Sequence, residues 1–111
     1  MQVVFVVLHK TELLQDLLTK LKKAGVSGGT IIDSQGMISY IQESDESYIL
    51  GSLRLFLEQA RPDSKKMFFI IKDEQVDLVF ETIDKALGGL ENHNTGIAFA
   101  MPITRVEGVV K

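Results

Sequence analysis

The hydrophobic residues of the chain fall into two kinds of pattern, short apolar runs and longer stretches with helical spacing. The runs are rich in β-branched and aromatic residues, which predicts strands. The predicted strands span residues 3–8, 30–34, 67–71 and 96–101. In the longer stretches apolar residues recur every three or four positions, which predicts amphipathic helices over residues 13–24 and 73–87. The order is therefore strand–helix–strand, an interlude, and again strand–helix–strand.

Polar residues and glycines mark the ends of both predicted helices. Thr11 and Asp73 precede the two apolar stripes and are predicted to cap the helices at their N-termini. Gly25 and the pair Gly88-Gly89 follow the stripes, where a residue in the left-handed conformation commonly ends a helix. Each half of the chain therefore contains one helix that crosses from its first strand to its second.

Two strand–helix–strand halves predict an α+β fold, the ferredoxin-like βαββαβ arrangement, in which two helices pack on one face of a four-stranded antiparallel sheet. The length of 111 residues suits a single domain over residues 1–111. The runs 3–8 and 67–71 are apolar without alternation, so both of their faces need cover. Because the helices cover one face only, we expect self-association to cover the other.

The interlude between the halves, residues 37–66, is long for a connection in a small domain and is predicted to be a functional insertion. Helical spacing over residues 49–60 favours a short helix, although the alternation at 52–55 is also compatible with a strand. The apolar residues of this insertion that we expect to contact a partner protein are Tyr48, Leu53 and Phe56.

Composition and charge exclude several classes of function. Twelve Lys and Arg against fifteen Asp and Glu give a net charge of −3, which argues against a dedicated nucleic-acid binder. The chain has no cysteine and two histidines, so thiolate chemistry is excluded and no metal site is predicted within one chain. The longest apolar run, residues 3–8, is far too short to span a bilayer, and we expect a cytoplasmic protein.

Candidate chemistry is sparse, because no nucleophile–base motif, phosphate-binding P-loop or zinc-binding helix motif is present. No catalytic residue is predicted, and the chain is not expected to be an enzyme. His9 ends the first strand, where a cleft could form, but the position also suits a solvated strand exit. The glycines of the 88–96 loop leave backbone N–H groups that could hold an anion, although glycines there also serve to end a helix.

The residues after the first predicted helix resemble a known family. The run Gly25–Ile31, Gly-Val-Ser-Gly-Gly-Thr-Ile, together with Gly36, resembles the signature of PII-type nitrogen regulatory proteins, in which a glycine opens the long T-loop. Residues 73–86, which begin Asp-x-x-Val-x-x-Val, are similar to the second helix of that family. Residues 96–103, Gly-x-x-Phe-x-x-Pro-Ile, are similar to its fourth strand. The resemblance covers about residues 1–36 and 65–106.

The resemblance implies a signalling protein of nitrogen regulation that forms a homotrimer. Such a protein binds a small effector in the clefts between subunits and regulates an enzyme, transporter or regulator through its T-loop, to which residues 37–66 correspond. The residues that this interpretation assigns to the effector cleft are His9, Gly36, Met37, Gly88, Gly89 and Gly96.

The resemblance also implies a nucleotide as one candidate effector, because classical members of the family bind ATP phosphates with basic side chains. At the matching positions this chain has Ile97, Gly108 and Val110, and Arg105 aligns with none of them. Each lost charge-assisted contact is worth about 1.5–3 kcal/mol. We therefore expect nucleotides to bind weakly, and the effector is otherwise unknown.

Metal-responsive CutA-type proteins share the trimeric architecture and are an alternative to the PII-type interpretation. Such a protein needs metal ligands that meet between subunits. His93 with Glu91 is the candidate pair in this chain.

Overall fold

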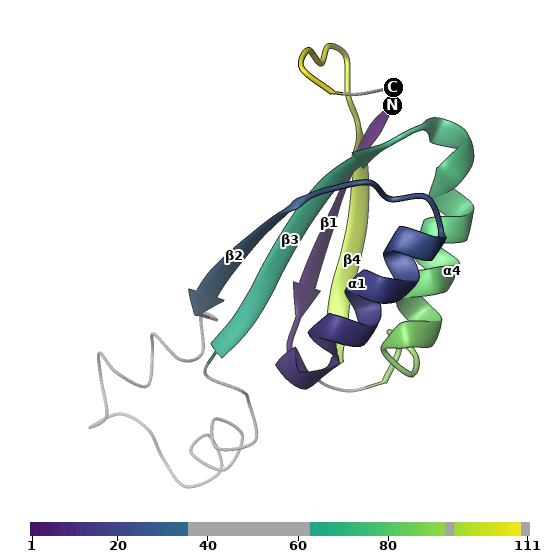
Figure 1. Ribbon diagram of the computed structural model, residues 1–111. Helices are drawn as coiled ribbons and strands as arrows, with labels where there is room; N and C mark the ends of the chain where they lie inside the picture. The colour runs from purple at the N-terminus through teal and green to yellow at the C-terminus, as the bar shows by residue number, and fades with distance from the viewer. Residues whose placement is uncertain (36–62, 93–94, 110–111) are drawn as a thin grey trace, which may run out of the picture.

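The computed structural model describes residues 1–35, 63–92 and 95–109, and Figure 1 shows how they fold. In chain order the elements are β1 (Gln2–Leu8), the 3-10 turn η1 (Thr11–Leu13), α1 (Leu14–Lys23), β2 (Thr30–Gln35), β3 (Asp63–Ile71), the 3-10 turn η3 (Asp73–Gln75), α4 (Val76–Ala86) and β4 (Gly96–Pro102). The predicted βαββαβ order is confirmed.

The described strands form one antiparallel sheet in the order β2–β3–β1–β4, so β1 is a central strand. Val4 of β1 lies opposite Phe69 of β3 and Ala100 of β4. Both helices pack on the same face of the sheet (Figure 1), as the ferredoxin-like arrangement requires.

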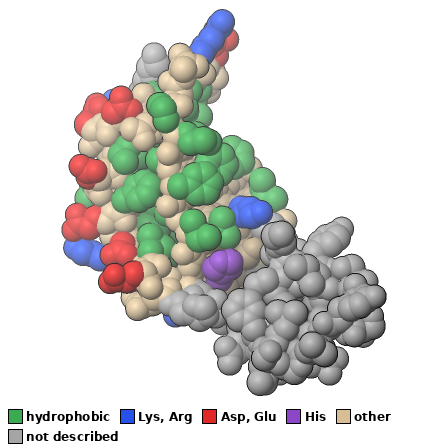
Figure 2. Space-filling view, turned by 180° about the vertical axis from the view of Figure 1, so that it is seen from behind, with side chains coloured by type: hydrophobic (Ala, Val, Ile, Leu, Met, Phe, Trp, Pro, Cys, Tyr) green, Lys and Arg blue, Asp and Glu red, His purple; other side chains and the backbone are tan. Residues whose placement is uncertain are grey.

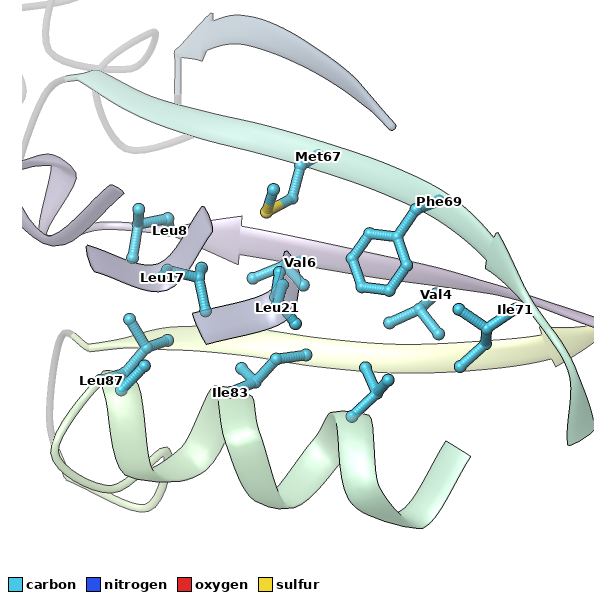
Figure 3. Close-up of a cluster of buried hydrophobic side chains, with 12 residues drawn as sticks. Val4, Val6, Leu8, Leu17, Leu21, Met67, Phe69, Ile71, Ile83 and Leu87 are labelled. Carbon is cyan, nitrogen blue, oxygen red and sulfur yellow. The ribbon is translucent and has the colours of Figure 1, made fainter. Parts of the chain in front are cut away.

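The hydrophobic core lies between the sheet and the two helices. Every second residue of β1, from Val4 to Leu8, is buried against the helices, as the alternation of a strand dictates. The helices contribute their apolar stripes, and Figure 3 shows these side chains pointing toward the strands. The fully buried helix residues include Leu17, Leu21, Val79 and Ile83. Among the described helices, none is long and apolar enough to cross a membrane.

The open face, as we call the side of the sheet that the helices leave uncovered, is also hydrophobic. Phe5 lies at its centre, with its ring centroid 5.7 Å from that of Phe68 and 5.1 Å from that of Phe99. Phe99 and Ile97 of β4 are 45% and 55% exposed. Other apolar residues in register on this face are Val3, Val7, Ile70 and Met101. Figure 2 shows hydrophobic side chains gathered across the molecule when it is seen from this side.

Glycine ends both helices, as predicted. At the end of α1 the Gly25 N–H donates to the Lys22 carbonyl at 3.1 Å and the Val26 N–H to the Leu21 carbonyl at 3.0 Å, which is a Schellman motif. Gly25 has a φ of +100°, a conformation that a side chain would strain. α4 ends in the same way at Gly88, whose φ is +74°.

The predicted N-terminal caps are wrong, because each helix begins with a 3-10 turn that already includes the expected cap residue. Thr11 is the first residue of η1, and no side chain caps that turn. Asp73 is the first residue of η3 and forms an ion pair with the amino group of Met1 at 3.2 Å. The backbone N–H of Lys72, just before η3, finds its hydrogen-bond acceptor inside the turn: it donates to Oε1 of Gln75 at 2.9 Å.

β3 begins at Asp63, four residues earlier than the apolar run predicted. Residues 63–66 therefore belong to the sheet and not to the insertion predicted over 37–66. These positions are mostly polar and carry no hydrophobic signal, but they pair with the end of β2. Asp33 lies opposite Lys65, and the two side chains form an ion pair.

The rest of the predicted insertion lies outside the described residues. The same holds for the predicted helix over 49–60 and for the candidate partner contacts Tyr48, Leu53 and Phe56.

We expect Ile83→Ala to lower the free energy of unfolding by about 2–5 kcal/mol, because it removes a side chain that is fully buried between α4 and the sheet. Leu78→Ala on the same helix is the matched control, since Leu78 is 51% exposed, and it should cost about 1 kcal/mol or less. Urea unfolding followed by circular dichroism measures both. Equal losses for the two variants would contradict the placement of the core.

Candidate functional site

The end of the sheet at which β1 finishes brings several predicted residues together. Leu8 of β1 lies opposite Gly96 at the start of β4, so His9 follows next to the 88–96 loop. Gln35, the last residue of β2, pairs with Asp63, the first of β3, at this same end. The chain therefore leaves and re-enters the described structure at the same end of the sheet as the strand exit and the loop. We call this end of the sheet the loop end.

The loop after α4 is organised by its own hydrogen bonds. The Gly88 N–H donates to the Lys85 carbonyl at 3.2 Å, and the Gly89 N–H donates to the Asp84 carbonyl at 2.8 Å. The Leu90 N–H donates to Oδ1 of Asp84, also at 2.8 Å. These three N–H groups have protein acceptors, so in this conformation they are not donors for a bound anion.

Thr95 connects this loop to the first strand, and sequence reasoning missed it. Its side chain is 1% exposed, and its hydroxyl lies 3.1 Å from the Gly89 carbonyl and 3.0 Å from the Asn92 carbonyl. Its own carbonyl accepts the His9 N–H at 3.3 Å. A threonine before a strand carries no signal of such a role, because the partners are set by the course of the loop.

The glycines assigned to the effector cleft have structural reasons for being glycine. Gly88 and Gly89 both have a positive φ and complete the end of α4. A Cβ on Gly96 would lie 2.5 Å from the carbonyl oxygen of Val7, so only glycine allows β4 to approach β1 there. These roles explain the residues without a ligand and are compatible with one.

The positive charge at the loop end comes from residues that were not predicted for the site. Lys66 of β3 is exposed and lies opposite Val7 on the open face. Ile97 of β4 lies opposite Val7 on the same face, from the strand on the other side of β1. Figure 2 shows a histidine and a basic side chain at the margin of the hydrophobic surface. Arg105 follows β4 at the opposite end of the sheet and forms an exposed ion pair with Glu107 at 2.9 Å.

Two hollows lie at the opposite end of the sheet, with volumes of about 540 Å³ and 270 Å³. Ser27, Ile70 and Val109 line both of them. The larger hollow is further lined by Met1, Gly25, Ile71, Lys72, Glu74 and Gln75, and the smaller by Gly28, Gly29, Thr30, Phe68 and Phe69. The glycine-rich run that carried the family resemblance thus forms the walls of a cavity, a role that the sequence analysis did not assign to it.

Three of the predicted site positions cannot be placed. Gly36 and Met37, at the base of the predicted insertion, lie outside the described residues, and so does His93. Glu91 is exposed. Within residues 1–35, 63–92 and 95–109, no group of three or more metal-ligating side chains is present.

The fold and the loop end define a small α+β module of the ferredoxin-like class with a long connection between its two halves. The family model of nitrogen regulatory protein P-II matches residues 1–111. The chain belongs to the P-II family, and it is a signalling protein that acts as a regulator and not as an enzyme. The search of curated proteins found no match.

We expect Thr95→Val to lower the free energy of unfolding by about 1–3 kcal/mol, because it removes, at nearly unchanged side-chain volume, the buried hydroxyl that lies against the Gly89 and Asn92 carbonyls. Thr19→Val is the matched control, since the Thr19 hydroxyl bonds an exposed helix carbonyl, and it should cost about 0.5 kcal/mol or less. Urea unfolding measures both values. A loss for Thr95→Val no larger than that of the control would show that the hydroxyl does not organise the loop.

Proposed function

We propose that the chain acts in the cytoplasm as a homotrimeric P-II signalling protein. It binds a small effector in the clefts between subunits and regulates a partner protein through the segment that connects β2 to β3, residues 36–62. The observation that carries this proposal is the hydrophobic open face, on which Phe5 stacks beside the half-exposed Phe99. A single protomer leaves this face in water, and large exposed apolar patches mark association surfaces.

Association of open faces would explain why large apolar residues outside the core lie on the surface of the protomer. Ile97 and Met101 are each about half exposed in the protomer, at 55% and 46%, although they are large and apolar. A second copy that covers them removes this surface from water, and the family is typically trimeric. Closed rings of identical subunits also create equivalent grooves at every subunit boundary, where small ligands commonly bind.

The loop end supports coupling between an effector and the long segment. His9 and the 88–96 loop lie at the end of the sheet where Gln35 and Asp63 anchor residues 36–62. A ligand bound at this end lies at the same end of the sheet as the points from which the segment starts and to which it returns. If the bound effector changes the affinity for the partner by some factor, the bound partner changes the affinity for the effector by the same factor.

The charges of the loop end favour a small anion as the effector. Lys66 is an exposed cation on the open face, and His9 adds a ring with hydrogen-bonding nitrogens. Triphosphate recognition needs several convergent cations, whereas Ile97 is apolar and Arg105 is paired with Glu107. ATP is therefore a weak ligand in this proposal.

Sedimentation velocity at micromolar concentration tests the trimer. The wild-type chain should sediment as a trimer, and Phe99→Glu should yield monomers, because it places a carboxylate in the apolar contact. Leu78→Glu introduces the same charge on α4, away from the open face, and should leave the trimer intact. A wild-type monomer would overturn the proposal, and so would a Phe99→Glu trimer.

A thermal-shift screen across nucleotides, cyclic dinucleotides, bicarbonate and divalent metals tests the effector site. We expect a small anion to raise the melting temperature, and ATP to bind more weakly than micromolar when measured by calorimetry. His9→Ala should weaken the effector at least about tenfold. Ser27→Ala, in the hollows at the other end of the sheet, should change its affinity by less than about twofold.

Three results of this screen would contradict the assignment. Micromolar affinity for ATP would show that the missing cations do not matter. Loss of binding in Ser27→Ala but not in His9→Ala would move the site to the hollows. Stabilisation by divalent metals alone, abolished by His93→Ala, would favour the metal-responsive alternative.

A further inference from the structure

A groove of about 390 Å³ lies between α1 and α4, apart from both the loop end and the open face. Ala24 and Leu78 are its apolar residues, and Thr82 lines it beside them. Leu78 is 51% exposed on α4, so it contributes little to the core. A single exposed leucine is common on protein surfaces, so a docking site is indicated only by the charged residues that line the groove with it.

Lysines from both helices surround this apolar floor. Lys20 and Lys23 belong to α1 and Lys85 to α4, so their clustering depends on how the helices pack and is not visible in either helix alone. The chain as a whole carries a net charge of −3. The three ammonium groups that line this groove are therefore opposite in sign to the net charge of the chain. They favour an acidic partner over a basic one.

Two of the lysines have carboxylate partners on their own helices. Lys20 lies 2.9 Å from Asp16 and Lys85 lies 2.9 Å from Glu81, both one helical turn away. The hydrogen bond and the charge of Lys85 lower the pKa of Glu81 below its usual value. Exposed pairs of this kind are weak, and both ammonium groups retain free donors. For Lys23, no carboxylate partner occurs in the part of the chain that the structure describes.

We propose that this groove docks an acidic segment of a partner protein. One leucine-like side chain of that segment packs on Leu78 and Ala24, and its carboxylates lie against Lys20, Lys23 and Lys85. An apolar anchor within a charged rim is the arrangement in which a few residues carry most of the binding energy and the charges select the partner. The residues of this surface are separate in sequence from residues 36–62, and the inference rests on the proposed function, in which that segment is the first contact to a regulated partner.

Fluorescence anisotropy with a labelled synthetic peptide tests the groove in the full-length protein. The peptide contains only glutamate and leucine, with leucines three and four positions apart. Binding should saturate, and Lys23→Glu and Leu78→Asp should each weaken it at least about tenfold. Lys22→Glu is the matched control, because Lys22 is exposed on the same helix but does not line the groove, and its effect should stay below about twofold.

Circular dichroism and sedimentation of each variant establish that fold and oligomeric state are retained, so a failure of the trimer is distinguished from a failure of the groove. Absence of saturable binding by the wild type would overturn the proposal. An equal loss in Lys22→Glu would show diffuse charge attraction. Retained binding of a peptide with serine in place of every leucine would show that Leu78 anchors nothing. Preference for vesicles of phosphatidylglycerol over the peptide would make the surface a lipid contact instead.

Discussion

The constraint on which the rest of this structure depends is that β1, a central strand, is hydrophobic on both faces while the helices cover only one. The residues that face the helices, Val4, Val6 and Leu8, are already buried in the single protomer. On the other face the stack of Phe5 on Phe99 lies in water in a single protomer. Burial of apolar surface is the largest favourable contribution to folding and association, so this face is the surface through which the proposed trimer would form. The proposed effector clefts exist only as a consequence of that assembly.

The loop end shows how structural and functional demands fall on the same residues. Gly88 ends α4 in a conformation that disfavours other residues, and Gly96 lets two strands approach. Thr95 then joins the loop to the strand exit at His9 through one buried hydroxyl and one carbonyl. These contacts are satisfied without a ligand, so the described part of the loop is held in place by the protein itself.

The positive charges of the described residues discussed above lie in two places. The position that resembles a phosphate-binding lysine holds Ile97 on the open face, and Arg105 forms a pair with Glu107. Positive charge is found instead at Lys66 and in the groove between α1 and α4. In the proposals made above, these two places are the contacts for a small anionic effector and for an acidic partner.

The sequence by itself determined the order of elements, the βαββαβ topology and the hydrophobicity of the second sheet face, because these follow from local periodicity and from the few ways of connecting strands through helices. It also pointed to the family through the run that begins at Gly25. It misplaced the start of β3, whose polar residues become strand only through pairing with β2, and it misassigned Thr11 and Asp73 as caps. Only the tertiary structure decided that Thr95 holds the loop, that Ser27 and Val109 meet around a hollow, and that lysines of two helices surround Leu78. These contacts join residues that are far apart in the chain, and register and helix packing, which leave no periodic trace in the sequence, bring them together.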